Sequence, residues 1–171
     1  MANTNVFRGS DATLTLAPSD PDMPEGAAAN EVIEFYQLSP VGRATGVEVV
    51  VQTELEEYHE IGRRHAAQLR PGNIRVSGRF ERAYINGALL RLLLGSGAVP
   101  ERIAEPYPQP SFNMQLRVED PATPGTTSTL TVHGVKLENW AYNLPEDDFV
   151  MESVTFKGLF ITVEDVEAAG G

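Results

Sequence analysis

Histidine and acidic residues near the middle of the chain have the composition of a zinc-protease site but not its spacing. His59 and Glu60 are followed by His65, which gives HExxxxH instead of HExxH. Histidines six positions apart lie about 240° apart around a helix, so they cannot bind one metal ion together. We therefore expect these three residues to be solvated, with no metal bound.

Other signatures of catalysis are missing from the sequence. It contains no cysteine, which excludes thiolate nucleophiles, disulfides and zinc–thiolate sites. There is no GxSxG, P-loop or GxGxxG motif, and GSGAVP at Gly95 follows a predicted helix, so it lacks the N-terminal dipole that binds phosphate. His133 is a lone strand histidine, more often a packing residue than a base. We expect neither enzymatic activity nor a cofactor.

Length and composition are those of one globular domain, residues 1–171. The hydrophobic fraction of 42% is enough for a sizeable core. The net charge of −11 argues against ordinary nucleic-acid binding, because phosphate contacts need a basic surface. It is compatible with a surface that repels nucleic acid, or simply with solubility. The start MANTNVFRGSD has no apolar signal region, and apolar runs are short, so we expect neither export nor membrane insertion.

A stretch from Gly46 to Gly95 organises the predicted fold. Its first strand alternates between an apolar and a polar face, the apolar one being Val47, Val49, Val51, Thr53 and Leu55. Residues 70–73, Arg-Pro-Gly-Asn, suit a type II turn. The second strand then directs Ile74, Val76, Gly78 and Phe80 inward. We expect the two strands to pair as a ribbon with one face in the core and the other in water.

A short helix is expected after this ribbon. Asn86 is its predicted N-cap and Gly95 its predicted C-terminal cap. Four leucines form an apolar stripe that should dock on the sheet: Leu89, Leu90, Leu93 and Leu94. Arg91 should lie outside this stripe.

Alternating patterns elsewhere predict further strands near 11–17, 112–118 and 128–137, with a bulge at Gly134, and a strand pair or one bent strand near 147–165. We expect residues 18–30, which are rich in proline and acids, to form a flexible arm or loop, and residues 166–171 to be a frayed tail. The predicted class is mainly β: an antiparallel β-sandwich or barrel with one flanking α-helix and a long charged inter-strand loop.

The predicted inter-strand connection separates its charges. The acidic residues Glu54, Glu56, Glu57 and Glu60 precede the basic residues Arg63, Arg64 and Arg70. One interpretation is a solvated loop. The other is a subunit-contact loop, whose acidic half meets the basic half of an identical neighbour in a head-to-tail contact that closes into a ring.

Three runs resemble tail tube proteins of tailed phages and phage-like injection particles: VGRATGVEVVVQTELEEYHEIGRR, IRVSGRFERAYINGALLRLLLG and DDFVMESVTFKGLFITVED. The resemblance extends from about Val41 to Asp165, and residues 18–30 have no counterpart in it. It implies a small β-sandwich with a flanking helix, assembled as hexameric rings that stack into a hollow tube through which DNA passes. It implies no catalysis and no cofactor.

The resemblance also implies partners and a location. These are other copies in a homo-hexamer, a tape measure protein, baseplate or terminator proteins, and a sheath if the tail is contractile, in a virion tail assembled in the host cytoplasm. The candidate lumen-facing residues are Glu48, Gln52, Arg75, Ser77, Arg79 and Glu81. An acidic lumen would keep DNA from sticking. The alternative is a ligand- or carbohydrate-binding β-sandwich, for which Trp140, Tyr142 and Tyr107 are the aromatic candidates.

Overall fold

The computed structural model describes residues 6–102 and 107–168. Within these ranges the chain forms seven strands, two α-helices and the short 3₁₀ helices Gly9–Asp11, Gly95–Ala98 and Pro100–Arg102. The helices are α1 (Pro24–Tyr36) and α2 (Ala88–Leu94). The strands are β1 (Ala12–Pro18), β2 (Ala44–Tyr58), β3 (Gln68–Ala83), β4 (Phe112–Glu119), β5 (Thr127–Asn143), β6 (Met151–Gly158) and β7 (Phe160–Val166).

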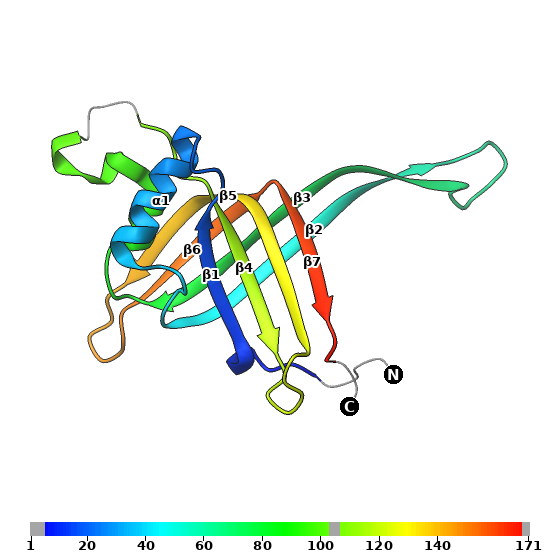
Figure 1. Cartoon of the computed structure of the whole chain (residues 1–171). Helices are drawn as coiled ribbons and strands as arrows, with labels where there is room; N and C mark the ends of the chain where they lie inside the picture. The colour runs from blue at the N-terminus through cyan, green and yellow to red at the C-terminus, as the bar shows by residue number, and fades with distance from the viewer. Residues whose placement is uncertain (1–5, 103–106, 169–171) are drawn as a thin grey trace.

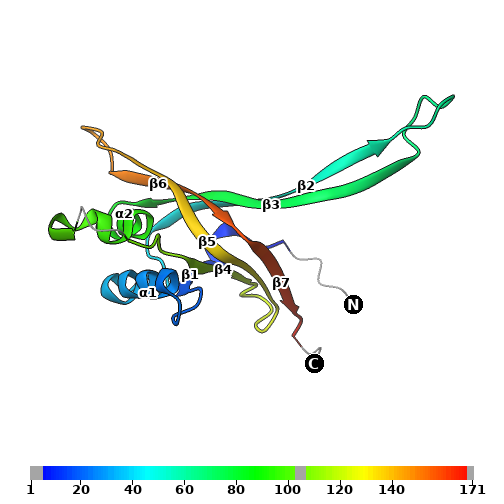
Figure 2. The same ribbon diagram turned by 90° about the horizontal axis from the view of Figure 1, so that it is seen from above.

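The strands form one curled antiparallel sheet, in the order β1-β4-β5-β6-β3-β2, with β7 paired to β5 (Figures 1 and 2). The first half of β5 pairs with β4 and β7, and its second half pairs with β6. Because only Leu159 separates β6 from β7, the two follow β5 as one bent strand. The predicted mainly β, antiparallel fold is confirmed. The described chain carries two α-helices, however, so the expectation of one flanking helix is wrong.

Alternating side chains of three predicted strands meet in the core. Both helices cover this side of the sheet, α1 over β1 and α2 over β5. The buried apolar side chains of these strands are Leu14 and Leu16 in β1, Phe112 and Met114 in β4, and Val132, Val135 and Leu137 in β5, whereas Leu116, Val118 and Leu130 are only half-buried. The helices therefore complete the hydrophobic layer that the curled sheet cannot close alone.

The predicted bulge at Gly134 is confirmed. Met114 pairs with Val132 while Phe112 pairs with Val135, so β5 has one residue more than β4 between these pairs. Gly134 has φ of 65°, and a Cβ there would lie 2.5 Å from Cδ1 of Leu159. Glycine is required because both the backbone conformation and the space exclude a side chain.

The arm or loop predicted for residues 18–30 is limited to residues 19–23, because β1 ends at Pro18 and α1 begins at Pro24. Proline is favourable at the first helical position, because the N–H that it lacks would have no hydrogen-bond acceptor within the helix there. The alanines that follow it have a high helix propensity. Gly26, Ala29, Val32 and Ile33 are buried at helical spacing. The expectation was wrong because it treated proline as a helix breaker at a position where it begins a helix.

The predicted frayed tail is also wrong for residues 166–168. Val166 still pairs with Thr127, and the N–H of Ala168 donates to Oγ1 of Thr126 at 3.2 Å. Residues 169–171 lie outside the described residues.

Helix α2 docks on the sheet as predicted, but with a different face. Asn86 does bind the helix start, since its Oδ1 accepts the N–H of Ala88 at 3.1 Å. Leu89 and Leu92 are fully buried, whereas Leu90, Leu93 and Leu94 are only half-buried. Of the predicted stripe, Leu89 is fully buried and Leu93 packs partly against the core, whereas Leu92 was not predicted, because α2 packs against α1 as well as β5. Arg91 lies between the helices, with its guanidinium 5.6 Å from the ring centroid of Phe35.

A buried ion pair lies at the end of the core under α2. Arg82 of β3 and Glu152 of β6 face each other across the sheet, each 1% exposed, and the Nε of Arg82 donates to Glu152. Nε1 of Trp140 donates to the second oxygen of Glu152 at 2.8 Å. Nη2 of Arg82 donates to Oδ1 of Asn86 at 3.2 Å. This network ties β3, β5 and β6 to the start of α2 and leaves neither buried charge unpaired.

The most extended feature is a two-stranded ribbon formed by β2 and β3 (Figure 1). The chain reverses at residues 59–67, and the N–H of Ala67 donates to the carbonyl of Tyr58 at 2.7 Å. Pro71 lies within β3 opposite Leu55, next to a register shift, so the predicted turn at 70–73 is a bulge instead. The expected long charged loop is consequently wrong: most of those residues are strand.

The ribbon has a core face only at its base. Pairing of β3 with β6 ends at Val76 and Gly158. Every β2 residue is exposed except Val49, which is half-buried. The expectation that the whole apolar face lies in the core is therefore wrong, because no second layer lies beneath the outer ribbon in one chain.

We predict that Leu92→Ala lowers the free energy of unfolding by about 2–5 kcal/mol, because it leaves a cavity where α2 meets the sheet. Leu93→Ala is the matched control: it removes the same atoms from a half-buried side chain of the same helix. Denaturant titration should show the smaller loss for Leu93→Ala. Equal losses would contradict the docking geometry of α2.

We also predict that Glu152→Gln lowers the free energy of unfolding by about 3–5 kcal/mol, because it leaves the Arg82 charge buried without a counter-charge. Glu138→Gln makes the same chemical change in an exposed pair, 3.4 Å from Lys157, and should cost about 1 kcal/mol or less. Thermal or denaturant unfolding measures both. A Glu152→Gln protein as stable as the control would refute the structural importance of the buried pair.

Candidate assembly surfaces

The residues first considered for chemistry lie apart. His59 and His65 are in the exposed turn of the ribbon, where Nε2 of His59 lies 3.1 Å from Oε2 of Glu57. His133 stacks on Phe160 with ring centroids 4.3 Å apart. Among residues 6–102 and 107–168, no three His, Cys, Asp or Glu side chains are grouped to bind a metal ion. In the same described residues, no helix is both long and apolar enough to cross a bilayer.

An apolar stripe runs along one face of the ribbon and consists of Val47, Val51, Leu55 and Ile74. Register places these side chains on the same face as buried Val76 and Phe80. Val47 and Val51, nearest the core, are 37% and 48% exposed, and Ile74 and Leu55 farther out are 64% and 60% exposed. Contiguous exposed apolar side chains on a long strand pair are typical of a surface that another chain covers.

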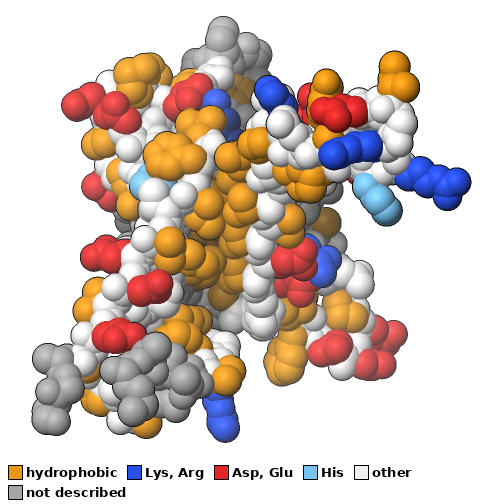
Figure 3. All heavy atoms as spheres, turned by 90° about the vertical axis from the view of Figure 1, so that its right-hand side faces the viewer, with side chains coloured by type: hydrophobic (Ala, Val, Ile, Leu, Met, Phe, Trp, Pro, Cys, Tyr) orange, Lys and Arg blue, Asp and Glu red, His pale blue; other side chains and the backbone are white. Residues whose placement is uncertain are grey.

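The apolar stripe also borders a hollow between the ribbon and the rest of the sheet. One groove of about 560 Å³ is lined by Leu14, Val41, Val47, Leu116 and Leu130, among others. A second groove, of about 340 Å³, lies between Val51 of β2 and Val163 of β7. Figure 3 shows apolar side chains along this hollow. In one chain the two halves of the sheet thus face each other across unfilled apolar space.

The six predicted lumen-facing residues do lie together on the opposite, polar face of the ribbon. Glu48 is opposite Arg79, with 3.6 Å between Oε2 and Nε, and Nη2 of Arg75 lies 2.8 Å from Oε1 of Glu54. Gln52 is opposite Arg75. The polar face continues across β6, since Ser77, Arg79 and Glu81 pair with Lys157, Thr155 and Ser153.

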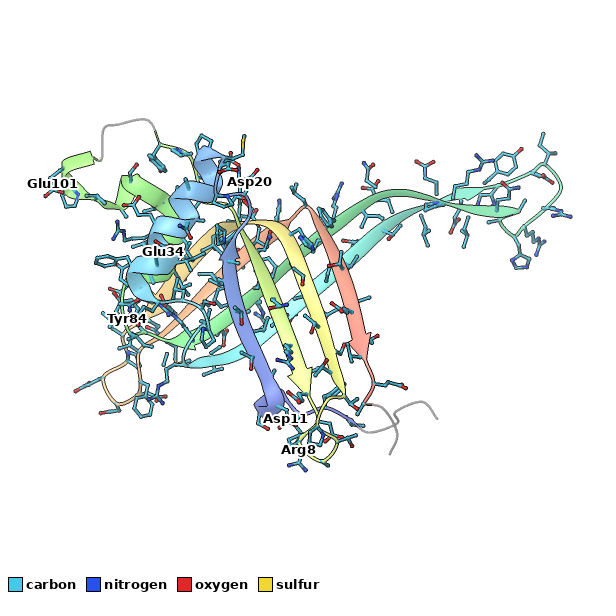
Figure 4. The ribbon with its side chains drawn as sticks, in the orientation of Figure 1. Arg8, Asp11, Asp20, Glu34, Tyr84 and Glu101 are labelled. Atoms are coloured by element: carbon cyan, nitrogen blue, oxygen red, sulfur yellow. The ribbon has the colours of Figure 1, made fainter. Side chains whose placement is uncertain are left out.

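The charges on this polar face are largely compensated. The six candidates include two glutamates and two arginines, so their formal charges cancel. Many acidic residues lie elsewhere: Asp20, Glu34 and Glu101 are on the helix side (Figure 4). These six residues therefore carry both charge signs and do not by themselves form an acidic surface.

The predicted subunit-contact residues are divided between two strands and a turn. Glu54, Glu56 and Glu57 are in β2, Arg70 is in β3, and Glu60, Arg63 and Arg64 are in the turn. Glu54 is already paired within the chain, and Arg70 donates to Oε1 of Gln68 at 3.4 Å. Among the described residues, Arg63 and Arg64 have no ion-pair partner. The basic turn is thus available to another molecule.

An aromatic cluster lies at the other end of the sheet, and it joins the predicted candidates Trp140 and Tyr142 to Tyr84, which the sequence patterns missed. Tyr84 stacks on Tyr142 with ring centroids 5.4 Å apart, and Tyr142 contacts Trp140 at 4.7 Å. Tyr107, the third aromatic residue proposed for a binding platform, instead lies against Gly97. Pairing of Ala83 with Met151 and of Tyr142 with Glu152 brings Tyr84 to this place, so only the strand register could have revealed the cluster.

Comparison with known proteins shows which solved structures have a similar fold. No family model matches the sequence, and no curated protein is significantly similar to it. The structure is similar to the tube-terminating cap of the anti-feeding prophage, with a TM-score of 0.60 and 11% identity over 96% of this chain and 95% of that chain. It is also similar to a chain of the sheath/tube terminator of the extracellular contractile injection system PVC, with a TM-score of 0.61 and 8% identity over 95% and 99% of the two chains.

A phage tail shows the same fold. The SPP1 tail tube has a TM-score of 0.55 and 11% identity over 95% of this chain and 81% of that chain. The similarities cover nearly the whole of the present chain, so they concern its overall fold and not one part of it. The predicted resemblance is confirmed at the level of the fold: this chain has the fold of tail tube and tube-terminator proteins.

Proposed function

We propose that this chain is the structural tube subunit of a phage tail or phage-derived injection particle. Copies form hexameric rings, and rings stack into a hollow tube through which DNA passes. The observation that carries the proposal is the apolar stripe: it belongs to the same strand faces as the core, yet no layer of its own chain covers it. The tube-protein fold supports another copy of the chain as the missing layer.

The sheet edges support association through backbone groups as well as side chains. β2 is 15 residues long and is the last strand in the order of the sheet, so its outer edge has no strand partner within the described chain. Long unprotected edge strands pair readily with other chains. A ring in which each ribbon covers its neighbour would bury both the edge and the apolar stripe.

The polar face of the ribbon is the proposed lumen surface. Ion pairs such as Glu48 with Arg79 and Glu54 with Arg75 leave little positive charge unpaired there. DNA would therefore pass without the phosphate contacts and counterion release that produce tight binding.

The proposed partners are those of a tube: a tape measure protein inside, baseplate or terminator proteins at the ends, and a sheath if the tail is contractile. Chains of similar fold come from a tube cap, a sheath/tube terminator and a baseplate, which supports placing this chain in such an assembly. Its location would be the virion tail, after assembly in the host cytoplasm. A structural role of this kind requires no catalysis.

A second candidate function is binding of a ligand or carbohydrate, and the stacked rings of Tyr84 and Tyr142 are the observation that favours it. Binding of glycans by a stable monomer would support this function over the tube.

We predict that Val51→Ser combined with Ile74→Ser prevents assembly but changes the free energy of unfolding by about 1 kcal/mol or less, because both side chains are exposed in the single chain. Size-exclusion chromatography and circular dichroism measure the two effects. Phe35→Ser removes an exposed apolar side chain from α1 and should leave assembly intact. Unchanged assembly of the double variant would refute the role of the apolar stripe.

We further predict that the protein does not shift duplex DNA at physiological salt, up to about 100 µM protein. Changing Glu48, Glu54 and Glu81 to lysine frees Arg75 and Arg79 and should produce binding that weakens steeply as salt increases. The control, with Glu31, Glu34 and Glu101 changed to lysine on the helix side, has the same net charge and should bind more weakly. Tight binding by the unmodified protein in a gel-shift assay would contradict the proposed lumen surface.

A further inference from the structure

The connection between β3 and α2 contains Asn86–Gly87, and this is the one Asn-Gly pair in the sequence. Such a pair is chemically reactive, because the main-chain nitrogen that follows the asparagine can attack the side-chain amide. Glycine leaves that nitrogen unobstructed, since it has no Cβ. Both residues are partly exposed, so water has access to them.

The fold does not require glycine at position 87. Gly87 has φ of −80°, a value that other residues adopt without strain. A Cβ built on it would meet no neighbouring atom within 4 Å. Neither backbone conformation nor space explains this glycine, in contrast to Gly134. What it provides is an unhindered nitrogen beside the amide of Asn86.

Hydrogen bonds hold the side-chain oxygen of Asn86 and leave the side-chain nitrogen free. Oδ1 accepts the N–H of Ala88 at 3.1 Å and an N–H of Arg82 Nη2 at 3.2 Å. Both neighbours are donors, which fixes the orientation of the amide. In the described part of the chain, Nδ2 makes no hydrogen bond. Donors aimed at Oδ1 stabilise the negative charge that develops on it when a nucleophile adds to Cγ.

The stronger of these donors is held in place by the buried ion pair. Arg82 is 1% exposed, and its Nε donates to Glu152. Its guanidinium is always charged and has further N–H groups for a second acceptor. A hydrogen bond between two charged groups is stronger than one between a charged group and an amide. The surroundings of Oδ1 therefore suit a carboxylate better than the amide that the sequence encodes.

We propose that Asn86 converts spontaneously to aspartate in the folded protein. In the first step the nitrogen of Gly87 bonds to Cγ, the Cγ–Nδ2 bond breaks, and ammonia leaves with the proton of that nitrogen. The product of this step is a five-membered succinimide ring. In the second step the oxygen of a water molecule adds to Cγ, the bond from Cγ to the Gly87 nitrogen breaks, and a water proton returns to that nitrogen.

The hydrogen bonds also select the product. Water that attacks the main-chain carbonyl of the ring instead of Cγ gives isoaspartate, which has an extra CH2 in the main chain. The main-chain oxygen of Asn86 accepts only the longer Arg82 contact, at 3.4 Å, whereas Oδ1 accepts two donors. An extra main-chain carbon would also displace Ala88 and Leu89, which are fully buried. The folded chain therefore favours normal aspartate.

The conversion would strengthen the base of the fold. A carboxylate at position 86 would pair with Arg82 through Nη2, while Glu152 keeps Nε, so that β3, β6 and the start of α2 share one charged network. The mature chain would have one more negative charge than its sequence encodes. This holds whether or not the chain forms tubes.

Peptide mass spectrometry tests the conversion during incubation in mildly alkaline buffer. In the folded protein, oxygen should replace NH at position 86, with aspartate in excess over isoaspartate. The urea-unfolded chain lacks the donors, so isoaspartate should predominate there. Asn143, which is exposed and precedes Leu144, is the internal control and should stay unmodified in the folded sample. Gly87→Ala should fold normally and slow the conversion at least about tenfold.

Denaturant titration tests the preference for a carboxylate. Asn86→Asp should unfold at a higher denaturant concentration than freshly prepared protein, by a margin that shrinks as salt is added. Asn86→Ala should unfold at a lower concentration, because it lacks the acceptor. Absence of conversion in the folded protein would overturn the proposal, as would the same ratio of aspartate to isoaspartate in folded and unfolded chains. An Asn86→Asp protein less stable than the fresh protein would also contradict it.

Discussion

The separation of β3 from β6 at Val76 is the constraint on which the rest of the structure depends. From Val76 to Ala83, β3 lies between β2 and β6, and its Val76 and Phe80 are in the core. From Gln68 to Val76, β3 and its partner β2 keep the same alternation but have no layer beneath them. The monomer therefore exposes side chains that a closed fold would bury, and the apolar stripe follows directly from strands longer than the core they belong to.

At the other end of the sheet, charged side chains are buried, whereas in the ribbon apolar side chains are exposed. There the chain buries a charge pair, which is costly unless every polar atom is satisfied. Arg82 and Glu152 meet this condition through Trp140 and Asn86, and the same contacts fix the start of α2 and the aromatic cluster. The chain thus consists of a base, held by helices and a buried pair, and a ribbon whose apolar side chains are left exposed by its own fold.

The sequence predicted local structure better than it predicted layers. Alternation located β1, β4 and β5, because each has one face that packs into the core over part of its length. The same alternation in β2 predicts a core face there too, but a period-two pattern in the sequence does not show whether a second layer covers that face. Pro71-Gly72 was assigned to the turn because those residues favour turns, but pairing of the flanking strands continues past them as a bulge. The Tyr84–Tyr142 contact depends on register across distant segments, which no local pattern contains.

Negative-stain electron microscopy of the unmodified protein, purified and concentrated, tests most directly whether the monomer is an incomplete unit. We expect hollow rings, and tubes of stacked rings at higher concentration, because other copies would cover the apolar stripe. A field of separate monomers at every concentration, with the fold intact by circular dichroism, would contradict it.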